Sequence, residues 1–305
     1  MLSSKEIEKL VQVQHKERLF PPSSIYHYTN ASVIDKILTN DGISFRMTKV
    51  SDFSDVYEGK SIEIYYDMAL EQLEQSGRIS SHQRSLFNRV ELPEKRVAVF
   101  KLPLKEGQPS ALMSSIHMIP YIICFSKNKC DPYMFKTYIK SEEQGYCLEF
   151  YGHDIASNAN ISHFGEGHKF KFYNVLYGNE IIDAIKQYIC DMLSCIHEIN
   201  DQIIEQFMLG PLAGKLQDLQ YSAKLSKYKQ ENEVRLVLFI PEAQACPAVY
   251  SPIYQEVEEN GKKYIYIKFN KHALRGIFAN RKVDCCHKMQ LQQELNSKRY
   301  GIQVK

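Results

Sequence analysis

The sequence predicts an α+β protein in which a β-sheet is flanked by helices and interrupted by one helical insertion. Short runs rich in β-branched and aromatic residues recur along the chain, which is typical of strands, and one long stretch repeats its apolar residues at helical spacing. The chain has 305 residues, of which 44% are hydrophobic and 24% charged, and this balance indicates a globular protein. No internal repeat or low-complexity linker divides it, so we expect a single domain over residues 1–305.

Composition limits the kinds of function. The formal net charge of +2 gives no electrostatic support for binding nucleic acid, although it does not exclude it. Residues 1–20 contain no continuous apolar run, so we expect neither a signal peptide nor a membrane span, and a cytoplasmic location in the producing cell. The eight cysteines form no C-x-x-C pair and have no repeated spacing, so we expect neither a metal site nor a disulfide framework.

The first part of the chain predicts a helix followed by a strand, a helix and a strand. An amphipathic helix within residues 1–20 is ended by Pro21-Pro22. Residues 24–29 predict a strand, residues 33–38 a short helix, and residues 43–47 a second strand that returns beside the first.

The middle of the chain continues this alternation. Residues 61–88 predict a helix that is interrupted near Gly77, and residues 97–102 and 121–126 predict strands. Pro132 stands in the first turn of the next predicted helix, where its missing N–H is tolerated.

Two helices make up the predicted insertion at residues 179–229. Strands are expected at 145–150 and 170–177, and apolar residues then recur at helical spacing from 179 to 209, where Gly210-Pro211 is expected to end the helix. A second, lysine-rich helix is expected over 212–228. After the insertion the sequence predicts a hairpin around residue 260 and a strand at 274–278.

Residues 229–239 predict a strand that is charged at its start and apolar along its body. Side chains alternate between the two faces of a strand, so Glu231, Glu233 and Arg235 would share one face, with the carboxylates roughly 7 Å apart. A solvated strand end is the alternative interpretation of these charges.

Three short motifs, taken in order, carry a resemblance. They are Tyr26-His27-Tyr28-Thr29, then Cys124-Phe125-Ser126, then Glu231-x-Glu233-x-Arg235. Together they resemble a widespread bacterial family of uncharacterised function. The first motif is also similar to the opening strand of the DNA-modifying ADP-ribosyltransferase toxins and the RNA 2′-phosphotransferases, in which a histidine contacts NAD. The resemblance implies an ADP-ribosyltransferase-like fold, a split mixed β-sheet with NAD bound across the cleft.

The resemblance also implies residue roles. His27, with Tyr28 and Thr29 beside it, would contact NAD, which is a substrate here. Ser126 would brace the site from the middle strand. Glu233 would lie at the nicotinamide ribose, and Glu231 would engage the acceptor, as in transferases that modify arginine.

The chemistry of the reaction explains why two acids are useful. Breaking the bond between nicotinamide and ribose develops positive charge on the sugar, and a carboxylate such as Glu233 stabilises it. An arginine acceptor is protonated in water, so a second carboxylate such as Glu231 is needed to orient it and take its proton.

Further contacts are expected around the cofactor. Arg46, on a strand predicted to neighbour His27, could hold the pyrophosphate, and Phe53 or Tyr57 could stack on nicotinamide. The sequence departs from the family pattern in this loop, because the usual Asn-Asp-Pro is replaced by residues 53–58 without a proline.

These observations predict a mono-ADP-ribosyltransferase that modifies a protein side chain such as arginine. It would be cytoplasmic in the producing cell and could be delivered into a host or target cell as an effector or toxin. Two alternatives stay open, a nucleic-acid ADP-ribosyltransferase or NAD glycohydrolase, and a non-catalytic binding module of the same fold.

Overall fold

The computed structural model describes residues 2–15, 22–52, 62–91, 96–101, 113–139, 143–157, 171–241, 255–259 and 261–305. Its contacts divide the chain into two compact units. The helical unit consists of Met1–Leu19, Ser54–Arg96 and Val175–Lys229, and the sheet unit of Phe20–Phe53, Val97–Asn174 and Gln230–Lys305. The predicted insertion at 179–229 therefore belongs to the helical unit, whereas a single domain over 1–305 stays a prediction.

Strand β4 (Met113–Ser126) organises the sheet unit. Strand β9 (Glu233–Pro241) pairs with one edge of β4 from Met118 to Ser126, and β6 (Lys171–Asn174) pairs with β9. The apolar body of β9 is thus paired on both sides, as its sequence of alternating Val, Leu, Phe and Ile predicts.

Strands β1 (Ser24–Asn30) and β2 (Ile43–Lys49) share the other edge of β4. Tyr26 of β1 lies opposite Ser126, and Thr48 of β2 lies opposite Ile122. The prediction that β2 returns beside β1 is wrong, because the 14 residues of β4 are long enough to pair with both strands in succession.

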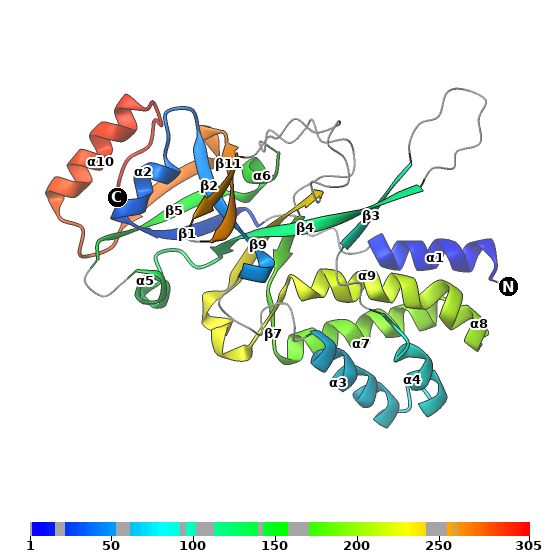
Figure 1. Cartoon of the computed structure of the whole chain (residues 1–305). Coiled ribbons are helices and arrows are strands. Elements are labelled where there is room, and N and C mark those ends of the chain that lie inside the picture. The colour runs from blue at the N-terminus through cyan, green and yellow to red at the C-terminus, as the bar shows by residue number, and fades with distance from the viewer. Residues whose placement is uncertain are drawn as a thin grey trace, which may run out of the picture. The chain divides into compact units, whose positions relative to one another are not determined.

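Two arms extend the sheet from this point. One arm continues from β1 to β5 (Gly145–Tyr151) and β12 (Leu274–Ala279), and the other from β2 to β11 (Lys262–Phe269) and β10 (Gln255–Glu259). Figure 1 shows the resulting curled sheet. All the described pairings with a defined register in this sheet are antiparallel, whereas a mixed sheet was expected. The prediction that the protein combines helices with a β-sheet is confirmed.

Helices cover the two faces of the sheet differently. Helices α2 (Ala31–Ile37) and α10 (Cys285–Ser297) lie side by side in Figure 1 and bury their apolar residues in the main core of the unit. Helix α5 (Pro132–Tyr138) packs Met134 against the other face, beside Tyr26 and Tyr28. Its predicted start is confirmed, since Pro132 follows the N-cap Asp131. The sequence interpretation missed α10.

The helical unit has an apolar core. It contains α1 (Ser4–His15), α3 (Ile62–Gln75), α4 (Ser81–Phe87), α7 (Asn179–Ser194) and α9 (Leu209–Gln220). The interruption of the predicted helix 61–88 is confirmed by the break between α3 and α4.

The predicted helix over 179–209 is wrong. Helix α7 ends at Ser194, and the side chain of Asn200 caps α8 (Asp201–Ile203), which passes through a π-helical turn into α9. Gly210-Pro211 does not end the helix, since Pro211 is the third residue of α9 and follows the π-helical turn. Helix α9 then ends at Gln220, earlier than the predicted 228. The remaining α-helix and strands are α6 (Gly152–Ser157), β3 (Arg96–Lys101), β7 (Leu176–Tyr177) and β8 (Ala223–Lys224).

Candidate functional site

The three sequence motifs meet at one end of β4. Ser126 lies opposite Tyr26 on β1 and opposite Glu233 on β9. Residues directly opposite each other in a sheet project to the same face, so these three side chains form a row across three strands. The sheet therefore brings together segments that are about a hundred residues apart in the chain, as the resemblance implied.

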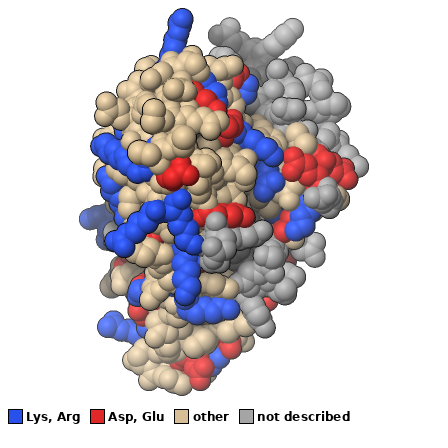
Figure 2. Space-filling model, turned by 90° about the vertical axis from the view of Figure 1, so that its left-hand side faces the viewer, with Lys and Arg blue, Asp and Glu red and all other residues tan. Residues whose placement is uncertain are grey.

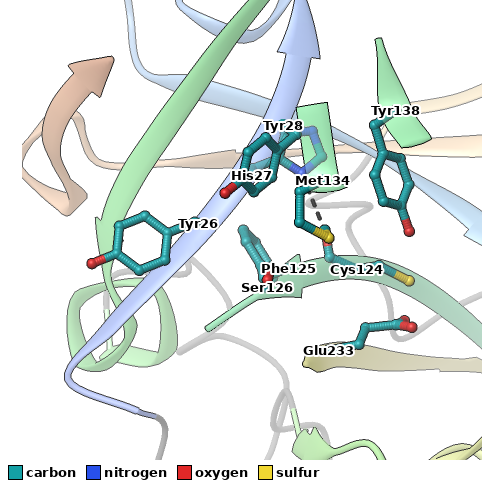
Figure 3. Close-up of a pocket in the computed structure, with 9 residues that line it drawn as sticks. All are labelled: Tyr26, His27, Tyr28, Cys124, Phe125, Ser126, Met134, Tyr138 and Glu233. Carbon is teal, nitrogen blue, oxygen red and sulfur yellow. Dashed lines mark hydrogen bonds between the residues drawn. The ribbon is translucent and has the colours of Figure 1, made fainter. Parts of the chain in front are cut away.

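A small pocket opens at this row (Figure 3). Its volume of about 30 Å³ is that of one or two water molecules, so a dinucleotide could place only one small group in it. The residues that line it are Tyr26, His27, Tyr28, Cys124, Phe125, Ser126, Met134, Tyr138 and Glu233. Four of the predicted site residues, His27, Tyr28, Ser126 and Glu233, are among them.

His27 lies on β1, one residue beyond the pair of Tyr26 with Ser126. Its Nδ1 lies 3.2 Å from the carbonyl oxygen of Cys124. A carbonyl only accepts hydrogen bonds, so Nδ1 donates, and Nε2 of the neutral ring is the acceptor. The ring packs edge-on against Phe45 and Phe125, and this burial lowers the pKa of His27 from 6.5 to about 4. His27 is therefore neutral at physiological pH and can accept a hydrogen bond from a hydroxyl group.

Glu233 is held in a buried ion pair. Its Oε1 accepts a hydrogen bond of 2.8 Å from Nε of Arg235, and the two side chains are only 2% and 3% exposed. The spacing of two residues places both on one face of β9, as predicted. Removing two charges from water is costly, and the pair is worth little to stability compared with apolar residues of the same volume. The solvated strand end is thus excluded for these two charges.

The prediction that Glu231 shares the strand face of Glu233 is wrong. Strand β9 begins at Glu233, and Glu231 ends the 3₁₀ turn η3 (Ser226–Glu231). Asn232 between them has a φ of 45°, in the left-handed region that asparagine tolerates. This residue interrupts the alternation on which the prediction depended. Glu231 is nevertheless buried, and its Oε2 accepts a hydrogen bond of 3.1 Å from the hydroxyl of Tyr138.

Ser126 braces the turn that carries the two acids. Its hydroxyl donates a hydrogen bond of 2.7 Å to the carbonyl oxygen of Glu231 and accepts one of 3.0 Å from the backbone N–H of Asn128. The side chain is 1% exposed, so its bonds are made within the protein. This geometry agrees with the bracing role that the resemblance implied.

Tyr138 is a site residue that the sequence interpretation missed. It comes from the last turn of α5, and Figure 3 shows its hydroxyl directed toward the side of the pocket that holds Cys124 and Glu233. Desolvation, together with Cys124 and the two carboxylates, raises the pKa of its hydroxyl. The hydroxyl is therefore a hydrogen-bond donor throughout the physiological range. Only its place at the end of a helix that begins next to the Cys124-Phe125-Ser126 motif could have pointed to it.

Of the other predicted cofactor contacts that the structure describes, Tyr28 lines the pocket, whereas Thr29 and Arg46 do not. Tyr28 lines it, but its hydroxyl donates to the carbonyl of Asn128 and accepts from the N–H of Asp131. Thr29 is buried one residue beyond, outside the pocket lining.

Arg46 lies on β2, outside the pocket lining. It forms an exposed ion pair of 3.3 Å with Glu259 and stacks over the ring of Tyr264 at 4.4 Å. Its strand is not adjacent to that of His27, contrary to the prediction. Phe53 and Tyr57 lie outside the residues that the structure describes.

Comparisons with known proteins add no further constraint. No protein-family model, curated protein or solved structure matches the chain. The resemblance therefore depends on the motif residues themselves. Within the described ranges, no group of three or more His, Cys, Asp and Glu side chains could hold a metal ion, and no helix is long and apolar enough to cross a membrane.

Proposed function

We propose that the protein cleaves the bond between nicotinamide and ribose in NAD and transfers ADP-ribose to a protein side chain, within an ADP-ribosyltransferase-like fold. The observation that supports this most is the convergence of His27, Ser126 and Glu233 from three strands on one pocket. The two arms that diverge from β4 also agree with a split sheet.

Glu233 would act on the ribose. As the glycosidic bond breaks, its electron pair leaves with nicotinamide and neutralises the pyridinium ring, while positive charge develops at C1′. A carboxylate held by Arg235 in a water-poor site stabilises that charge without having to reorient. The acceptor then bonds to C1′ and loses a proton. His27, as a neutral acceptor, would fix a ribose hydroxyl through Nε2.

Water as the acceptor is the second candidate, which makes the protein an NAD glycohydrolase. Two observations favour it over transfer to arginine. The pocket has room for only one or two water molecules, and Glu231 is 3% exposed and bonded to Tyr138. A guanidinium would need both a larger space and an accessible carboxylate.

A nucleic-acid acceptor has less support. The lysines before Glu231 make contacts within the helical unit: Lys229 pairs with Glu180, while Lys224 and Lys227 lie over the ring of Tyr228. On the face shown in Figure 2, basic side chains stand in small groups among acidic ones, which agrees with the net charge of +2.

Incubation with NAD labelled in its adenylate part, with and without a cell lysate, separates the candidates. Label on a protein that disappears with Glu233→Gln supports the transferase, and label on nucleic acid supports a nucleic-acid acceptor. Release of nicotinamide without label transfer supports the glycohydrolase. A thermal shift by NAD without turnover indicates a binding module, and the absence of binding and turnover contradicts the proposal.

A further inference from the structure

We infer that Asn128 is a positioning residue, whose side chain clamps the turn carrying Glu231 and Glu233 to the end of β4. The catalytic part of this inference rests on the proposed function. The β4–β9 ladder ends at the pair formed by Ser126 and Glu233, so the candidate acid occupies the last pair. Strand ends are the places where a ladder opens locally, because the next backbone groups lack ladder partners.

The three residues from Ser126 to Asn128 continue the contact beyond the ladder. The N–H of Lys127 donates to the carbonyl of Asn232 at 2.9 Å, and the hydroxyl of Ser126 donates to the carbonyl of Glu231 at 2.7 Å. The side-chain Nδ2 of Asn128 donates to the carbonyl of Gln230 at 3.0 Å. Each carbonyl from Gln230 to Asn232 thus accepts a hydrogen bond from this segment.

The side chains of Asn128 and Asn232 also bond to each other. Nδ2 of Asn232 donates to Oδ1 of Asn128 at 2.9 Å, while Nδ2 of Asn128 also donates to Oδ2 of Asp131 at 3.1 Å. The orientation of the Asn128 amide follows from these partners, since the carbonyl of Gln230 and the carboxylate of Asp131 only accept. Asn232 is the left-handed residue between the two acids, so this bond fixes the point at which the chain changes direction.

The backbone of Asn128 connects the same point to the other two motifs. Its N–H donates to the hydroxyl of Ser126, and its carbonyl accepts from the hydroxyl of Tyr28 at 2.6 Å. The Tyr28 hydroxyl in turn accepts from the N–H of Asp131, the N-cap of the helix that carries Tyr138. Asn128 therefore links all three motifs and α5, although it belongs to none of the motifs.

This arrangement predicts an effect on turnover rather than on binding. Arg235 fixes the Glu233 carboxylate within β9, but the place of the strand end relative to β1 and His27 depends on the clamp. A displacement of about 1 Å at a reacting group can cost about a hundredfold in rate. We expect Asn128→Ala to lower the turnover of NAD by about tenfold to a hundredfold, with KM for NAD within about threefold of the wild type.

A compensating variant tests the geometry directly. In Asn128→Asp, a carboxylate oxygen replaces the donor and faces both the carboxylate of Asp131 and the carbonyl of Gln230, and both contacts are repulsive. In Asn128→Asp combined with Asp131→Asn, the donor and acceptor are exchanged, and an asparagine still caps α5. The double variant restores the contact with residue 131 but still has no donor for the carbonyl of Gln230, so its turnover should exceed that of Asn128→Asp and stay below that of the wild type. Turnover of Asn128→Asp equal to that of the wild type would contradict the clamp.

Asn270→Ala is the matched control. Asn270 caps a 3₁₀ turn through an Oδ1 that accepts from the N–H of His272, away from the pocket. It should lower the melting temperature and leave turnover unchanged. If the loss of turnover in Asn128→Ala and in Asn270→Ala is proportional to the decrease in melting temperature of each variant, the role of Asn128 is only structural. The inference is then overturned.

Hydrogen exchange separates this inference from the proposed function. If the wild type shows no turnover of NAD, the proposed function fails, and the clamp is judged by the exchange of peptides that cover residues 125–130. Loss of the clamp in Asn128→Ala should speed the exchange of the Lys127 N–H at least tenfold and leave β12 unchanged. Unchanged exchange at Lys127 overturns the clamp whether or not the protein is an enzyme.

Discussion

The two units of the protein differ in whether they bury charged side chains. Among the described residues of the helical unit, the buried polar side chains are uncharged, namely Gln217 and Ser222, and ion pairs such as Arg89 with Glu205 lie at the surface. The sheet unit buries Glu231, Glu233 and Arg235 at one end of β4. Stability alone favours the first arrangement, because burying an ion pair costs about as much as the pair returns. The difference indicates that the buried charges at the end of β4 serve a purpose other than stability.

A double-mutant cycle on each pair measures this difference and has the largest expected effect. Glu233→Gln and Arg235→Met should each lower the free energy of unfolding by about 3–5 kcal/mol, because each removes the opposite charge from a buried charged side chain. For Arg89→Met and Glu205→Gln we expect about 0–1 kcal/mol, since both side chains are exposed and screened. Urea unfolding of the four single variants and two double variants provides the values. Equal coupling free energies for the two ion pairs would contradict the difference between the two units.

The pH dependence of stability should show the next largest effect. The pKa of His27 is about 4 in the folded protein against 6.5 for the ordinary group, so the unfolded chain binds the proton first as pH falls. The contribution of neutral His27 to the free energy of unfolding is fully present above pH 6.5. It is lost as the pH falls from 6.5 to 4. The loss is on the order of 3 kcal/mol at most, at 1.36 kcal/mol per pKa unit.

His27→Gln should remove this part of the pH dependence while keeping a donor for the Cys124 carbonyl. The difference between the urea unfolding curves of wild type and variant, measured from pH 7.5 to pH 4.5, isolates the contribution of His27. His82→Gln in the helical unit is the control, because His82 is exposed and pairs with Asp201 at the surface. A difference curve for His27→Gln that is flat with pH would contradict the assignment.

A pair of tyrosine variants gives the smallest effect on stability and the sharpest comparison. Tyr138 donates to the carboxylate of Glu231, and Tyr66 of the helical unit donates to the carbonyl of Phe87 at 2.8 Å. Both Tyr138→Phe and Tyr66→Phe should cost about 1 kcal/mol. Only Tyr138→Phe should change the ratio of ADP-ribose transfer to nicotinamide release, because it removes a hydrogen bond to the Glu231 carboxylate. A ratio that is the same in both variants would show that Glu231 has no part in acceptor choice.

The local elements near the site could be predicted from the sequence because their signals are local. Short runs rich in β-branched and aromatic residues predicted β1, β5, β9 and β12, and Pro132 predicted the start of α5. The pairing of strands was not predictable in the same way. The sequences of β1 and β2 do not indicate that both strands pair with β4. This pairing depends on the length of β4 and not on the Cys124-Phe125-Ser126 motif.

The candidate site was predicted only in part for a related reason. Glu233 and Ser126 were identified because they stand in motifs, whereas Asn128 and Tyr138 act through partners about a hundred residues away. Glu231 was misplaced because a Glu-x-Glu pattern does not reveal a left-handed residue at its centre, although asparagine is among the residues that adopt that conformation.

The rate of nicotinamide release from NAD by wild type, Glu233→Gln and Glu205→Gln tests the central claim most directly. We expect the wild type and the surface variant to release nicotinamide at the same rate, and Glu233→Gln, measured below its melting temperature, to be slower by about a thousandfold or more. Release by Glu233→Gln within threefold of the wild type, or no release by the wild type, would contradict the assignment of Glu233 as the catalytic acid.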